Sequence, residues 1–168
     1  MNIIVGTLLI LCVVIAAMKI ATWNLPCRIA VCATWCLLPV VCAGEVASLP
    51  VMTVDDLADL PLFAAGLWTE GILIIAYCVS EPSRGVVYRL LRPYPGLMCA
   101  FVFYLLLAYS FMLMADCNFA VCGLAVGAAS GLVLLLLSST LRRLADNTLL
   151  TELLFATEII TLLLTCLI

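Results

Sequence analysis

The stretch FAVCGLAVGAASGLVLLLLS, residues 119–138, holds twenty residues and no charged side chain. A helix needs about 20 mostly apolar residues to cross the hydrocarbon core of a bilayer, so this stretch predicts a transmembrane helix. Further long apolar runs lie on both sides of it, separated by short polar segments. The sequence therefore predicts an all-α integral membrane protein.

The composition of the whole chain supports this fold class. Of its 168 residues, 67% are hydrophobic and 10% are charged, whereas soluble domains have about 45–50% apolar and about 25% charged residues. The mean hydropathy is +1.35. This composition excludes a secreted disulfide scaffold, a disordered chain and an ordinary cytosolic enzyme.

Hydropathy divides the chain into six candidate spans within a single membrane domain, residues 1–168. The second span is short and contains Pro39, so we expect it to kink or to lie partly in the interface. Lys19 follows the first apolar run, whereas in a cleaved signal peptide basic residues precede it, and we therefore expect the first span to be retained. Thr53 and Asp56 resemble a capping box for a short interfacial helix. The spans are residues 3–21, 27–43, 61–80, 96–115, 119–138 and 147–168.

The charged residues sort between the two sides of this six-span topology. All seven basic residues flank the first, third and fifth connections, and five acidic residues fall on the other side. This is the positive-inside pattern, and it places both termini on the less basic side. The basic residues are Lys19, Arg28, Arg84, Arg89, Arg92, Arg142 and Arg143, and the five acids are Glu45, Asp55, Asp56, Asp59 and Asp116.

Several classes of partner and cofactor are not expected. The net charge of −3 argues against nucleic acid, and the absence of histidine removes histidine-based haem, zinc and catalytic sites. The ten cysteines form no CxxC pair, so we interpret them as small buried hydrophobic residues. We expect no cofactor, no metal and no active site within this chain.

Two acidic positions lie inside apolar regions. Glu70 falls within the third span, where a carboxylate is costly unless it is paired, protonated or near water. It is either part of a proton path or interface, or an interfacial residue near the start of the span. Glu158 lies in the sixth span, within the sequence SSTLRRLADNTLLTELLFATE, residues 138–158.

This 138–158 stretch has two interpretations. If it continues the fifth span as one helix, a polar stripe with an embedded Arg143 covers a sector of about 120°, which is typical of a helix that faces a water-lined or protein-lined path. Alternatively, Arg142 and Arg143 anchor a short loop, and residues 146–147 cap the next helix. The stripe comprises Ser139, Thr140, Arg143, Asn147, Thr151, Glu158, Thr161 and Thr165.

Residues 139–154 resemble the fifth-helix signature of the ATP synthase subunit a family. The matching positions are Ser139, Arg143, Leu144, Asn147 and Glu152. The resemblance implies a stator subunit that forms two proton half-channels against a ring of c subunits. Arg143 would face the ring carboxylate, and an arginine suits this role because it stays charged in low dielectric.

In this resemblance, Ser139, Asn147 and Glu152 would be polar neighbours of Arg143, with Glu158 a weaker candidate. The match is divergent, because Ala145-Asp146 and the additional Arg142 depart from the family pattern. If the resemblance holds, either the helix assignment shifts, or the family's last helix is lost or supplied by another chain. The implied partners are the c-ring, other subunits of a large membrane complex, and lipid. The implied location is an energy-coupling membrane, either the mitochondrial inner membrane or a bacterial plasma membrane.

A second resemblance keeps an alternative open. Residues 118–154 are similar to the second and third helices of NADH dehydrogenase subunit 6 and its antiporter relatives, and this similarity places the arginines in a loop. It implies a proton-pumping subunit of a respiratory membrane arm. A structural accessory subunit is the third possibility.

Overall fold

The computed structural model describes residues 2–48, 61–80, 86–113 and 118–167, and the regular structure in these ranges is entirely helical. The all-α prediction is therefore confirmed. Five helices are long and apolar enough to cross a membrane, namely α1, α2, α4, α7 and α8. The described helices are α1 (Asn2–Ala21), α2 (Leu25–Ser48), α4 (Pro61–Val79), α5 (Val86–Leu91), α6 (Met98–Leu113), α7 (Phe119–Leu144) and α8 (Asn147–Thr165).

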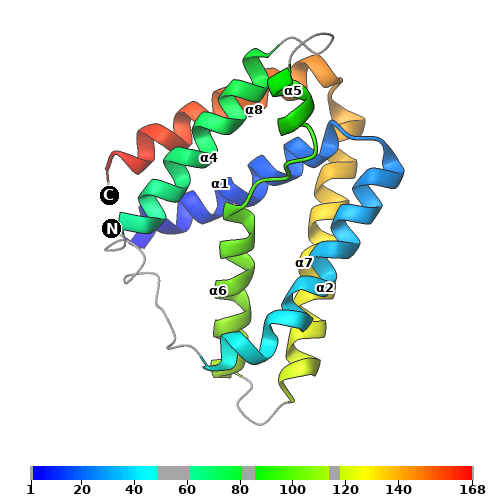
Figure 1. Ribbon diagram of the computed structural model, residues 1–168, viewed down its shortest axis with the longest axis vertical. Coiled ribbons are helices and arrows are strands. Elements are labelled where there is room, and N and C mark those ends of the chain that lie inside the picture. The colour runs from blue at the N-terminus through cyan, green and yellow to red at the C-terminus, as the bar shows by residue number, and fades with distance from the viewer. Residues whose placement is uncertain (1, 49–60, 81–85, 114–117, 168) are drawn as a thin grey trace.

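Each predicted span has a helix, but the lengths differ. Helix α2 has 24 residues and continues through Pro39, so the short second span of the prediction is wrong. Its ribbon bends in the second half of the helix (Figure 1), as expected near a proline that lacks an N–H donor. Helix α6 has only 16 residues. The proposed capping box at Thr53 and Asp56 lies outside the described residues.

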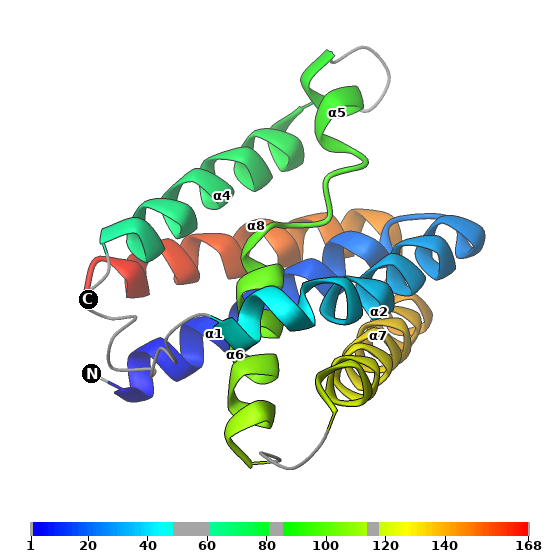
Figure 2. The same ribbon diagram turned by 60° about the horizontal axis from the view of Figure 1, so that its bottom comes forward.

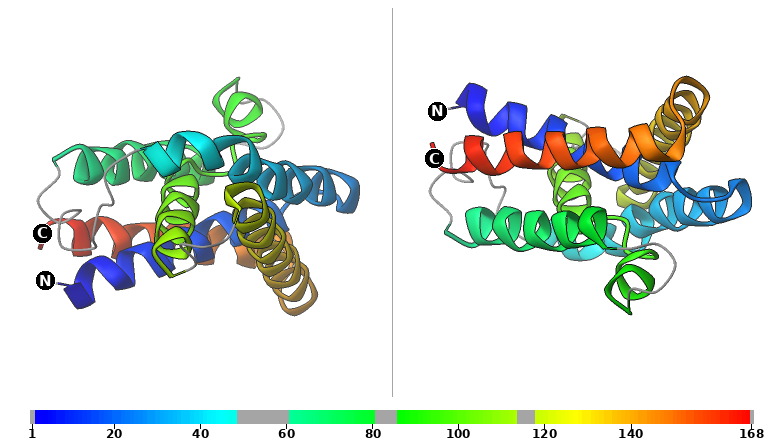
Figure 3. Two further views of the ribbon diagram at one scale, coloured as in Figure 1. Left: turned by 90° about the horizontal axis from the view of Figure 1, so that it is seen from below. Right: turned by 90° about the horizontal axis from the view of Figure 1, so that it is seen from above.

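The helices form two groups. Helices α1, α4 and α8 run alongside one another, α2 and α7 pack against each other, and α6 lies between the two groups (Figure 1 and Figure 3). The short α5 lies at the margin of the bundle (Figure 2). The first group holds most of the buried charged side chains, and for this reason it contains the candidate site.

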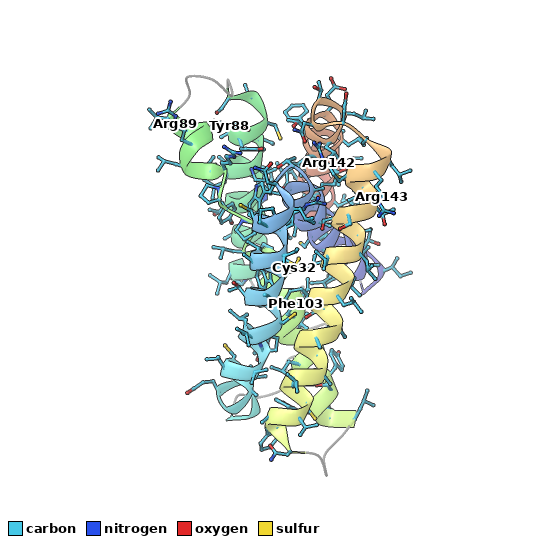
Figure 4. The ribbon with its side chains drawn as sticks, turned by 90° about the vertical axis from the view of Figure 1, so that its right-hand side faces the viewer. Cys32, Tyr88, Arg89, Phe103, Arg142 and Arg143 are labelled. Atoms are coloured by element: carbon cyan, nitrogen blue, oxygen red, sulfur yellow. The ribbon has the colours of Figure 1, made fainter. Side chains whose placement is uncertain are left out.

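The described basic side chains gather where α1, α4 and α7 end and α2 and α8 begin, which we call the basic end. Arg142 and Arg143 lie in the last turn of α7, and Arg89 lies in the last turn of α5. Figure 4 shows these three arginines toward the same end of the molecule. This distribution agrees with the positive-inside topology. Lys19 differs from the exposed arginines, because it is 1% exposed.

Candidate functional site

The chain breaks between α7 and α8. Helix α7 ends at Leu144, Ala145 has an extended backbone, and the Asp146 side chain accepts a hydrogen bond from the Leu149 amide at 2.8 Å. Asp146 is thus the N-cap of α8. One continuous helix through residues 138–158 is therefore wrong. The cap at Asp146 that the alternative predicted is confirmed, but Arg142 and Arg143 lie in the last turn of α7 and not in a loop.

This break places Arg143 at a helix end. Helix α7 has 26 residues and is about 39 Å long, which exceeds a hydrocarbon core of about 30 Å. Arg142 and Arg143 are exposed in its last turn, as Figure 4 shows. The Arg142 guanidinium donates a hydrogen bond to the side-chain oxygen of Asn147, and this contact bridges the two helices. Ser139 is half-buried on α7.

Glu70 occupies the middle of α4 and is 5% exposed. Its Oε2 accepts a hydrogen bond from the Met98 backbone amide at 2.7 Å and one from the Tyr94 hydroxyl at 3.2 Å. The Leu97 amide donates in turn to the Tyr94 oxygen at 3.2 Å. Glu70 is therefore an interior residue with fixed partners, and an interfacial position near the start of the span is wrong.

The partners of Glu70 come from a non-helical segment, residues 92–97, that enters the interior between α5 and α6. Pro93 and Pro95 lack backbone N–H donors and disfavour a helix around Tyr94. Gly96 has a φ of 104°, a conformation that favours glycine, and a Cβ at this position would lie 2.9 Å from Glu70 Oε1. Glycine therefore allows the chain to turn beside the carboxyl group.

Helix α6 begins against this carboxyl group. The first amides of a helix have no partner within the helix, and the positive end of the helix dipole favours an anion there. Met98 is the first residue of α6, and its amide contacts Glu70. Non-helical backbone at membrane depth is tolerated only where it is buried in protein or lines a cavity. The non-helical segment 92–97 therefore needs such surroundings within the bundle.

Glu158 approaches the same region from α8. It is 2% exposed, and its Oε2 has no hydrogen-bond partner. Its Oε1 would lie 3.0 Å from a Cβ at Gly71, the residue that follows Glu70. The absence of a side chain at Gly71 therefore lets the Glu158 carboxyl group approach the backbone of α4. We refer to Glu70 and Glu158 as the carboxyl pair.

Tyr94 interacts electrostatically with both members of the carboxyl pair. Burial raises the pKa of the Tyr94 phenol to about 12, and the charges of Glu70 and Glu158 act in the same direction. The phenol therefore remains protonated at neutral pH and keeps its hydrogen to donate to Glu70. The two carboxyl groups also interact electrostatically with each other. A buried carboxyl group with an open oxygen is suited to taking up and releasing a proton.

A polar cavity of about 430 Å³ opens at the basic end, between α4, α5 and α8. It brings together Asn147 and Glu152, two of the residues singled out in the sequence, and both are exposed. Other lining residues come from the end of α4, from α5 and from Thr22, which follows α1. The principal lining residues are Thr22, Tyr77, Tyr88, Asn147, Thr151 and Glu152.

The structure thus divides the predicted site residues between two places. Glu70 and Glu158 form the interior carboxyl pair, and Asn147 and Glu152 line the cavity. Ser139 and Arg143 lie outside both. Tyr94 was not predicted as a site residue, although its position between Pro93 and Pro95 indicates a break in the helix. The burial of Lys19 was not predicted either, because its position near the end of an apolar run resembles that of an interfacial anchor.

Among the described residues, no group of three or more cysteine, aspartate or glutamate side chains is close enough to hold a metal ion. Comparisons with protein-family models, with curated proteins and with solved structures gave no match to this chain.

Proposed function

We propose that this protein translocates protons across a membrane, with the carboxyl pair as the groups that take up and release the proton. The observation that carries the proposal is a pair of buried carboxyl groups in the interior of two spanning helices, beside the broken start of α6. A carboxyl group at this depth is expensive to keep charged and is, by default, a functional residue. Transport gives these groups a role that a purely structural subunit would not require.

The two carboxyl groups have different surroundings. Glu70 is held by the Tyr94 hydroxyl and the Met98 amide, whereas one oxygen of Glu158 has no partner. Beyond Glu158, the buried face of α8 continues with Thr161 and Thr165 toward the end of the helix. This polar face supports a route from Glu158 toward the side on which the termini lie.

Proton flux into vesicles tests the proposal. The full-length chain, reconstituted into vesicles that contain a pH-sensitive dye, is expected to conduct protons when a potassium gradient and valinomycin impose a membrane potential. An apolar carbodiimide, which reacts with protonated carboxyl groups, is expected to block the flux and to modify Glu158 or Glu70, as located by peptide mass spectrometry. Flux no greater than that of protein-free vesicles, with neither glutamate modified, contradicts the proposal.

The narrower prediction is a stator subunit of an F-type ATP synthase in a coupling membrane, mitochondrial or bacterial, with a c-ring as partner. Arg143 carries this prediction, because it is exposed on α7 and none of the described acidic residues forms an ion pair with it, so its guanidinium is open to a neighbouring subunit. The NADH dehydrogenase alternative and the structural alternative instead place Arg142 and Arg143 at a membrane surface, and the exposed position of both in the last turn of α7 also fits these alternatives.

If the stator prediction holds, Arg143→Ala abolishes ATP-driven proton pumping in the native membrane, and Arg142→Ala serves as the matched control on the same helix turn. Fluorescence quenching of an acridine dye measures the pumping. Retained pumping in Arg143→Ala contradicts the stator assignment and leaves the carboxyl-pair proposal in place.

A further inference from the structure

A groove of about 480 Å³ lies at the basic end, between the start of α2 and the segment that follows α5. It is separate from the cavity between α4, α5 and α8, because none of the described residues lines both. Its volume falls within the range of about 300–1,000 Å³ that is typical of small-molecule sites. The groove is therefore large enough to hold a ligand of its own.

Most of the wall that α2 contributes is apolar. Cys27, Ala30 and Val31 line the groove. Leu25 and Ile29 lie on the same turns of α2 and are exposed, and α2 is one of the helices long enough to span a membrane. Exposed apolar surface of this kind marks a place of contact with lipid or another apolar partner. An acyl chain suits this wall better than a fully polar ligand does.

The charge at the groove is positive. Arg92 is exposed and lines the groove, and no acidic residue is among the described lining residues. Arg28 follows the lining residue Cys27 along α2. It is 9% exposed, and its Nε and Nη1 have no hydrogen-bond partner. A buried guanidinium without a partner is costly, and its charge acts over distance without direct contact. Both arginines therefore favour an anionic group in the groove.

The start of α2 adds to this positive field. Asn24 precedes α2 and Cys27 lies in its first turn, and both residues line the groove. The first amides of a helix have no partner within the helix, and the positive end of the helix dipole favours an anion such as phosphate. The helix dipole and the two arginines thus act in the same direction.

The groove also lies at a suitable depth in the membrane. Trp23, which follows α1, forms part of its wall, and tryptophan is enriched at the level of the lipid headgroups. The positive-inside rule places the basic end on the cytoplasmic side. The leaflet on that side carries the anionic phospholipids. The groove therefore faces the leaflet whose headgroups match its charge.

We propose that this groove binds a membrane phospholipid with an anionic headgroup, with the phosphate beside Arg92 and an acyl chain along Ala30 and Val31. Basic pockets between spanning helices on the cytoplasmic side bind such headgroups. Arginine suits this role, because its planar guanidinium donates two parallel hydrogen bonds to a phosphate. The cavity between α4, α5 and α8 suits an anion less well, because Glu152 lines it. Lipid binding does not depend on the proposed proton transport.

Native mass spectrometry of the full-length chain in detergent tests the proposal. Phosphatidylglycerol and phosphatidylcholine with the same acyl chains are added in equal amounts, and the protein is expected to retain phosphatidylglycerol in preference. Arg92→Gln is expected to lower this retention about fivefold, the factor that one basic residue contributes near an anionic lipid surface. Arg92→Lys, which keeps the charge, is expected to restore most of it.

Arg89→Gln is the matched control. Arg89 is exposed on α5, three residues before Arg92, and does not line the groove, so its replacement is expected to leave the lipid preference unchanged. Equal retention of the two lipids by the unchanged protein overturns the proposal. Equal losses in Arg92→Gln and Arg89→Gln also overturn it, because diffuse charge at the basic end would then hold the lipid. Unfolding midpoints in detergent confirm that the variants are folded.

Cys27 provides a second readout within the groove itself. Cys27 and Cys166 are both exposed, and Cys166 follows α8 at the end of the molecule away from the basic end. Phosphatidylglycerol is expected to slow the alkylation of Cys27 by N-ethylmaleimide, to leave Cys166 unchanged, and to lose this effect in Arg92→Gln. Peptide mass spectrometry measures both sites. Alkylation of Cys27 at the same rate with phosphatidylglycerol and with phosphatidylcholine overturns the proposed position of the lipid.

Discussion

Glu158→Gln is expected to lower proton flux through reconstituted vesicles by at least about 100-fold, the scale on which positioned proton-transfer groups contribute. Glutamine has nearly the shape of glutamate but cannot release a proton. Glu158 is the more informative member of the carboxyl pair, because its Oε2 has no hydrogen-bond partner. Replacement of Glu70 would also disturb the contact with the Met98 amide. The loss of flux in Glu158→Gln would therefore report on proton transfer rather than on folding.

Two further variants complete this experiment. Glu158→Asp keeps the carboxyl group on a shorter stem, so we expect flux between that of the unchanged protein and that of Glu158→Gln. Glu45→Gln makes the same carboxyl-to-amide change at an exposed position near the end of α2, and its flux is expected to stay within about twofold of the unchanged protein. Undiminished flux in Glu158→Gln would exclude this carboxyl group from the path.

The presence of the spanning helices was predictable, because it depends on local sequence. A run of about 20 apolar residues identifies a spanning helix without knowledge of its neighbours. The ends of the helices were less predictable, and α7 extends six residues beyond the predicted 119–138. Thr140 in this extension is compatible with a helix because its hydroxyl donates to the Leu136 carbonyl. Ser138, at the predicted end, donates in the same way to the Leu135 carbonyl.

The candidate site was predictable only in part. The depth of Glu70 and Glu158 in apolar runs marks them as unusual, and both are buried. The partners of Glu70 lie 24 and 28 residues further along the chain, at Tyr94 and Met98, and no sequence spacing joins them. The burial of Lys19 likewise depends on the packing of α1 against α4 and α8, which local composition does not encode.

The prediction of a continuous polar stripe was wrong, and the sequence itself contains the local reason. Helical periodicity placed Arg143, Asn147 and Glu158 on one face, but periodicity assumes an unbroken helix. Asp146 favours an N-cap over a helix interior, and the structure uses it as one. Where a capping residue predicts a helix boundary and the periodicity predicts an unbroken helix, the capping residue is therefore the better guide.

Gly127→Ala is expected to destabilise the fold by about 2 to 3 kcal/mol, the upper range for overpacking. Gly127 lies on α7 where α2 approaches most closely, and a Cβ there would overlap the Cys36 carbonyl oxygen and lie 3.1 Å from its carbonyl carbon. Because these atoms belong to the backbone, no change of rotamer relieves the overlap. The two helices must move apart.

The neighbouring glycines show why this movement is costly. A Cβ at Gly123 would lie 2.9 Å from the Pro39 carbonyl oxygen, and a Cβ at Gly131 would lie 2.9 Å from the Cys32 carbonyl oxygen. With Gly127, these glycines recur every fourth residue and form a smooth face along which α2 packs. Small residues at this spacing allow close helix packing in membranes, so a shift at Gly127 disturbs the whole contact.

The unfolding midpoint in detergent measures this effect, with Gly6→Ala as the matched control. Nothing lies within 4 Å of a Cβ at Gly6, so alanine there is expected to leave stability unchanged or to raise it by up to about 1 kcal/mol. Equal midpoints for the two variants would contradict the close packing of α2 on α7. The carboxyl pair lies on α4 and α8, so flux per folded molecule should survive Gly127→Ala. Glu158→Gln is expected to give the opposite result, with stability kept and flux lost, because the carboxyl pair that we propose to transfer the proton lies on α4 and α8, whereas this glycine face packs α7 against α2.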